Sequence, residues 1–127
     1  MKRGTVIKVS LLALVVGAGV ALPTLNFGAE KEEPKIQSIK GEVVDMMCYV
    51  DHNAVGEKHG QSCGAKCIKS GGPAGIVSDG KAYLVVGEHK PMNDQLAEYC
   101  GKTITLKGKM AERGGIAMIE NAEIVKK

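Results

Sequence analysis

Residues 75–110 read GIVSDGKAYLVVGEHKPMNDQLAEYCGKTITLKGKM and carry signals for a hairpin, a helix and a further strand. Asp79 and Gly80 stand between two apolar runs. An Asp-Gly pair in this position is a strong signal for a β-hairpin, because the tight turn needs residues that tolerate a positive φ. The runs on either side, residues 75–77 and 81–86, are therefore expected to be antiparallel neighbours in a sheet.

A helix and another strand are expected after this hairpin. Pro91 can open the helix and Gly101 can end it. Between them the apolar residues recur with the helical period: Met92, Leu96, Tyr99 and Cys100. This pattern places Cys100 on the apolar face, as a buried thiol. Residues 102–110 then alternate between apolar and polar side chains, which is typical of a strand with one buried face.

Two further strands flank this stretch. The first is expected from residue 36, with one face directed to the core: Ile39, Gly41, Val43 and Met47. The last is expected over residues 116–125, after a turn at residues 113–115. This order is that of an OB-fold, a five-stranded Greek-key barrel with a helix between strands three and four. The prediction is an all-β domain with short helices over residues 36–127, and a small open β-sandwich is the alternative.

The residues with the most distinctive chemistry lie in an insertion at residues 48–73, between the first two strands. It holds three of the four cysteines and two of the three histidines: Cys48, His52, His59, Cys63 and Cys67. Ser62 can cap a short helix over residues 63–70, and the Gly-Gly-Pro run at residues 71–73 would end it. Two cysteines four residues apart on such a helix share one face, and His59 falls a further four residues back.

The first interpretation of this insertion is a soft-metal site. The thiolates of Cys63 and Cys67 would bind copper or zinc. The remaining ligands would come from three residues: Cys48, His59 and His52. Met46 and Met47 are further candidates, as thioether donors for Cu(I), and strand spacing predicts that one of them lies in the core. Covalent haem is not expected, because the chain has no Cys-x2-Cys-His motif.

Two other interpretations remain open. Disulfides could staple the domain into a binding module, for example from Cys48 to Cys63 or Cys67, each worth typically ~2 to 4 kcal/mol. Four cysteines allow three complete pairings, and the sequence does not choose among them. A bridge between two cysteines four residues apart on a helix is disfavoured by its torsion. Alternatively, a thiol-disulfide redox protein would need a reactive thiolate, such as Cys63 at a helix N-terminus.

Residues 1–29 have the layout of a secretory signal peptide. Two basic residues, Lys2 and Arg3, stand near the start, with Lys8 just before an apolar run over residues 9–22. This run is short for a membrane span, and a small-residue pair ends at Ala29. Cleavage is expected after Ala29, and an uncleaved membrane anchor is the alternative. Residues 30–35 are charged and are expected to form a flexible leader. The expected location is therefore the periplasm or the exterior of a bacterial cell, where disulfides can form.

The charge balance argues against a nucleic-acid-binding protein. The chain has 17 Lys and Arg against 14 Asp and Glu, but three of the basic residues lie in the signal segment: Lys2, Arg3 and Lys8. The remaining domain is formally neutral and has few aromatic side chains for stacking on bases. The spacing of the cysteines and histidines indicates no catalytic triad, so an enzyme is not expected. The expected partner is an envelope protein or a small ligand, with membrane contact only through an uncleaved signal segment.

Several motifs together resemble a group of small exported bacterial proteins. They are GEVVDMMCYV at residues 41–50, HGQSCGAKCIKSGGPAGIV at 59–77, the hairpin DGKAYLVVGEHK at 79–90 and the tail GKTITLKGKM at 101–110. The shared pattern is G-x-V-x-D-x-x-C-Y, followed by C-x3-C and a Gly-Pro element. The resemblance covers residues 36–125. It implies an OB-like domain in the cell envelope, with Cys48, Cys63 and Cys67 as its distinctive residues.

Overall fold

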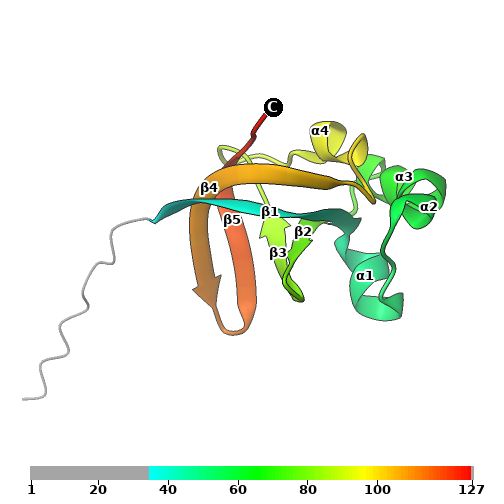
Figure 1. Ribbon diagram of the computed structural model, residues 1–127, viewed down its shortest axis with the longest axis horizontal. Coiled ribbons are helices and arrows are strands. Elements are labelled where there is room, and N and C mark those ends of the chain that lie inside the picture. Colours follow the sequence, from blue (N-terminus) through cyan, green and yellow to red (C-terminus); the bar gives the residue numbers. More distant parts are fainter. Residues whose placement is uncertain (1–34, 127) are drawn as a thin grey trace, which may run out of the picture. The chain divides into compact units, whose positions relative to one another are not determined.

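The computed structural model describes residues 35–126 (Figure 1). The expected signal segment, residues 1–29, lies outside these described residues, and so does the expected leader except for its last residue. Within residues 35–126, no helix is both long enough and apolar enough to cross a membrane.

Five strands and five short helical segments follow one another along the described chain. The strands are β1 (Ile36–Asp45), β2 (Ala74–Ser78), β3 (Lys81–Val85), β4 (Thr103–Arg113) and β5 (Ile116–Ile124). The helical segments are α1 (Met46–His52), α2 (Glu57–His59), the π-helical η1 (Gly60–Gly64), α3 (Ala65–Lys69) and α4 (Asn93–Ala97). The segments from α1 to α3 form the insertion between β1 and β2, and α4 lies between β3 and β4.

The strands close into a barrel in the order β1-β2-β3-β5-β4, with β4 pairing back to β1. β3 and β5 run parallel, whereas the other neighbouring pairs are antiparallel. This is the strand order of an OB-fold, and α4 occupies the place predicted for its helix. The predicted five-stranded barrel is therefore confirmed, and the open β-sandwich is excluded. Figure 1 shows that α1, α2 and α3 gather at one end of the barrel, where β1 ends.

The predicted hairpin joins β2 to β3. The two strands pair antiparallel, beginning from Ser78 and Lys81 on either side of the turn. Asp79 (φ 49°) and Gly80 (φ 76°) both adopt the left-handed conformation that such a two-residue turn requires. The Asp-Gly pair therefore sets the register of this part of the barrel.

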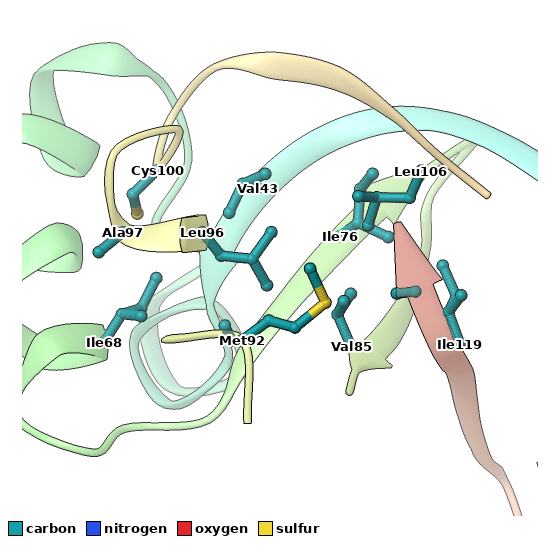
Figure 2. Packing of buried hydrophobic residues seen from close by; sticks show 12 residues of the cluster. Val43, Ile68, Ile76, Val85, Met92, Leu96, Ala97, Cys100, Leu106 and Ile119 are labelled. Carbon is teal, nitrogen blue, oxygen red and sulfur yellow. The ribbon is translucent and has the colours of Figure 1, made fainter. Parts of the chain in front are cut away.

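The barrel strands, α3 and α4 enclose one apolar core (Figure 2). Its fully buried members come from four strands and from both helices: Val43, Ile68, Ile76, Leu96, Leu106 and Ile119. Burying one such side chain contributes about 1.5–3 kcal/mol, so this cluster supplies much of the driving force for folding. Cys100 belongs to the same cluster and is 3% exposed, which confirms the prediction of a buried thiol.

The structure differs from the expected pattern at the end of β1. The strand ends at Asp45, because the side chain of this residue caps α1, which begins at Met46. Met47 therefore lies on the helix and is 65% exposed. Met46 is half-buried, and neither methionine belongs to the core cluster. The prediction that one of the two lies in the core is wrong.

The helix of the insertion also begins earlier than residue 63. Segments α2, η1 and α3 form one helical run over residues 57–69, preceded by Gly56 (φ 88°). Ser62 does not cap this run, because its hydroxyl donates to the carbonyl oxygen of His59, one turn back, at 3.3 Å. The run ends before Gly71 (φ 100°), as the Gly-Gly-Pro signal predicts.

Candidate metal centre

The end of β1 places Cys48 in the first turn of α1. Asp45 caps this helix, and its Oδ1 atom accepts a hydrogen bond from the backbone N–H of Cys48 at 2.8 Å. The backbone N–H of Met46 donates to the carbonyl oxygen of Pro73 at 2.9 Å, so α1 begins beside the start of β2. Because Asp45 is only 1% exposed, the barrel itself fixes the position of Cys48.

The segment α3 is anchored both to the core and to α4. Ile68 is fully buried, and the Asn93 side chain of α4 donates to the carbonyl oxygens of Ile68 at 2.7 Å and Gly72 at 2.8 Å. The backbone N–H of Gly72 in turn donates to the carbonyl oxygen of Cys67 at 2.9 Å. The backbone around Cys67 is therefore held in place without any contribution from its thiol.

Cys48, Cys63 and Cys67 converge, and we call them the thiol cluster. Their three sulfur atoms lie within 4.8 Å of one another. The Sγ atom of Cys63 is 3.7 Å from that of Cys67. Cys63 is exposed, whereas the other two cysteines are half-buried. A group of three thiols at these distances could hold a metal ion.

All four cysteines are free thiols. A disulfide needs a sulfur–sulfur distance of about 2.05 Å, and the 3.7 Å between Cys63 and Cys67 is far longer. None of the bridges considered from the sequence is therefore formed in this structure. The sulfur of Cys100 instead lies 2.6 Å from the place where a Cβ atom on Gly64 would be.

The surroundings of Cys48 and Cys67 favour their protonated thiols. A hydrogen bond with the Asp45 carboxylate, together with burial, raises the pKa of Cys48 to about 12. A hydrogen bond with Cys63 is the main cause that raises the pKa of Cys67. A redox-active thiol needs a shift in the opposite direction, so these two residues do not support the thiol-disulfide interpretation. A metal ion would displace both protons on binding.

The two histidines considered as ligands lie outside the group of converging sulfurs. The Nε2 atom of His52 is 3.0 Å from the Oδ2 atom of Asp51, and both side chains are exposed. The Nε2 atom of His59 is buried without a hydrogen-bond partner and lies near Gly64, as the sulfur of Cys100 does. The structure brings together three of the five candidate ligands. Ligation by His52 or His59 stays a prediction.

A pocket of about 630 Å³ opens beside Cys48, and we call it the methionine pocket. Its lining comes mainly from α1 and includes Met46, Met47, Cys48, Val50, His52 and Pro73. Sequence reasoning missed both this pocket and the role of Asp45, because both depend on where β1 ends. An Asp three residues before Cys48, at the end of an apolar run, is the capping signal that could have located α1.

The fold and the site together define a small closed β-barrel with a cluster of three cysteines that could hold a metal ion. No protein-family model matches the chain, and neither a curated protein nor a solved structure matches it significantly. The function is therefore argued from the geometry of the thiol cluster and its surroundings.

Proposed function

We propose that this chain is an exported protein of the cell envelope that binds a soft metal ion, copper or zinc, through Cys48, Cys63 and Cys67. The observation that carries the proposal is the mutual distance of the three sulfurs, all within 4.8 Å. Two sulfurs that share one ion at ~2.3 Å and subtend a tetrahedral angle lie ~3.8 Å apart. The 3.7 Å between Cys63 and Cys67 agrees with that spacing.

The origin of the three thiols supports the same function. Cys48 lies on α1, whereas Cys63 and Cys67 lie one turn apart on the helical run over residues 57–69, so two separate parts of the insertion contribute the three sulfurs. The supporting hydrogen bonds run through Asp45 and Asn93, which lie outside the thiol cluster. A site whose ligands are held by such outer contacts loses less conformational entropy when the ion binds.

The location rests on the first 29 residues, with their basic start, apolar run and small-residue end. The resemblance to small exported bacterial proteins supports the same compartment. We assign the chain a binding role and not a catalytic one, because a thiol whose pKa is raised to about 12, as in Cys48, is a poor nucleophile at neutral pH. The partner is an envelope protein or a small ligand that gives or takes the ion.

The full chain, expressed in bacteria and purified from the envelope without chelator, tests the proposal. Elemental analysis should find about one equivalent of copper or zinc, because one group of thiolates holds one ion. Cys48→Ser, Cys63→Ser and Cys67→Ser should each lose most of this metal. Cys100→Ala removes the thiol outside the cluster and should retain it. Metal-free protein whose cluster thiols are closed in a disulfide would refute the proposed function.

The same sample tests export. Intact mass should show a mature chain that begins after Ala29, recovered in the envelope fraction. A chain of full mass in the cytoplasmic fraction would refute the proposed location while leaving the metal site to be judged on its own result.

A further inference from the structure

The methionine pocket places soft donors beside Cys48 of the thiol cluster, and one of them, Met47, has no role in packing. None of the residues of α1 is buried, and Met47 is 65% exposed. Val50, one turn further on, is 75% exposed. Removing large apolar side chains from water is the usual way in which a helix gains stability from packing. Met47 and Val50 do not serve that purpose, so their role must be sought in the pocket that they line.

The two thioethers of the pocket differ in their surroundings. Met46 is half-buried and packs on β2, where its Sδ atom fills the space that a side chain on Gly75 would occupy. Met47 projects into solvent. Cys48 follows them directly and lines the same pocket. One anchored thioether, one exposed thioether and one cluster thiol therefore belong to residues that line the same pocket.

The donor types in this arrangement distinguish Cu(I) from Zn(II). Thioethers and thiolates are soft ligands that select Cu(I), whereas zinc in structural sites takes four ligands that are thiolates, imidazoles or carboxylates. Within residues 35–126, no fourth Cys, His, Asp or Glu donor joins the three sulfurs. Of the other candidates, His52 lies beside Asp51, and the Oδ1 atom of Asp45 caps α1. The Nε2 atom of His59 is buried near Gly64 and does not belong to the group of converging sulfurs. A Cu(I) ion, which accepts three sulfur ligands, needs no fourth.

We propose that the bound ion is Cu(I), which enters through the methionine pocket, binds transiently to the thioethers of Met46 and Met47, and passes to three-coordinate binding by the thiol cluster. This rests on the proposed function and adds the identity of the ion and its route. The copper–thioether bonds break as the copper–thiolate bonds form. Each thiol that coordinates releases its proton to solvent, and the ion stays Cu(I), so no oxidant or reductant takes part.

Loading kinetics test the route. The reduced, metal-free protein is mixed without oxygen with Cu(I) held by a chromogenic bidentate chelator, and the rate and extent of transfer are read from its absorbance. Met46→Leu combined with Met47→Leu keeps volume and apolar character but removes both thioethers. Loading should be several-fold slower at unchanged equilibrium affinity. Met110→Leu, on β4 outside the pocket, is the matched control and should load as the wild type does.

X-ray absorption of the loaded protein tests the final site. The expected result is Cu(I) with three sulfur neighbours. Added Zn(II) should not displace the ion. Equal loading rates in the double variant and the wild type overturn the route. A preference for Zn(II) in a four-coordinate site overturns the whole inference and leaves the proposed function standing. Failure to bind either metal overturns both.

Discussion

Asp45 joins the barrel to the thiol cluster through one buried carboxylate. Its Oδ1 atom caps α1 at Cys48, while its Oδ2 atom is buried without a hydrogen-bond partner. The same carboxylate is the main cause of the raised pKa of Cys48. A single residue outside the cluster therefore controls both the position and the protonation of one of its thiols.

Asp45→Asn should separate these two effects. The amide oxygen can still cap α1, but the hydrogen bond of Cys48 with a carboxylate and the negative charge are both lost, so the pKa of Cys48 should fall from about 12 toward its ordinary value. In the metal-free protein, alkylation of Cys48 should then begin at lower pH, as followed by peptide mass spectrometry. Asp45→Ala should also cost about 0.5–2 kcal/mol of unfolding free energy, because the cap is lost. An alkylation profile that does not move in Asp45→Asn would rule out the carboxylate as the cause.

The sequence predicted the residues of the cluster better than it predicted their support. Cys63 and Cys67 are four apart in a helical run, and that spacing alone brings their side chains to one face. Their approach to Cys48 depends on the path of residues 53–56, for which no spacing rule exists. The cap at Asp45 was missed because an apolar residue, Met47, returns at the next alternate position, so the pattern makes Asp45 an interruption within the strand and not its end.

At the scale of elements, the helical run over residues 57–69 approaches the end of α4 at Gly64. A Cβ atom on residue 64 would lie 2.6 Å from the sulfur of Cys100, closer than real atoms come. A larger residue at position 64 would therefore force the Cys100 side chain or the helical run to move. Because Cys63 is the neighbour of Gly64, the same contact sets where the exposed thiol of the cluster stands.

Gly64→Ala should therefore destabilise the fold and weaken metal binding together. Overpacking of this kind costs typically 1–3 kcal/mol, measurable by denaturant unfolding of the metal-free protein. Combining it with Cys100→Ala removes the sulfur that the new methyl group meets. The double variant should be more stable than the sum of the two single effects predicts. Strict additivity would show that the contact with Cys100 is not the cause of the destabilisation.

The strands and the helices of the insertion differ in how well they could be predicted. Alternation and the Asp-Gly turn locate β2 and β3 because a strand with one buried face constrains every second residue. The predicted start of the helical run was wrong because Gly60 and Gly64 have low helix propensity, and close packing against Cys100 holds them in the helix. The sequence could not show whether the cysteines are free thiols or disulfides, since only the distances between their sulfur atoms distinguish the two.

In the whole molecule, the proposed metal site and the apolar core are built from different residues. None of the fully buried apolar residues belongs to the thiol cluster, so we expect the barrel to close without metal. The described contacts of α1 with the barrel are few, and they are centred on the Asp45 cap and the bond from Met46 to Pro73. An ion held by Cys48, Cys63 and Cys67 would join α1 to η1 and α3.

Metal binding should accordingly stabilise a protein that already folds without the ion. The metal-free chain should unfold in a single cooperative transition, and metal at about 100 times its dissociation constant should add ~2.7 kcal/mol to the free energy of unfolding. Hydrogen exchange should slow most at residues 46–69, which carry the three ligands, and least in β4 and β5. A metal-free chain without a cooperative transition would instead make the ion part of the folding core. Uniform protection over all five strands would show that the cluster and the barrel form one cooperative unit.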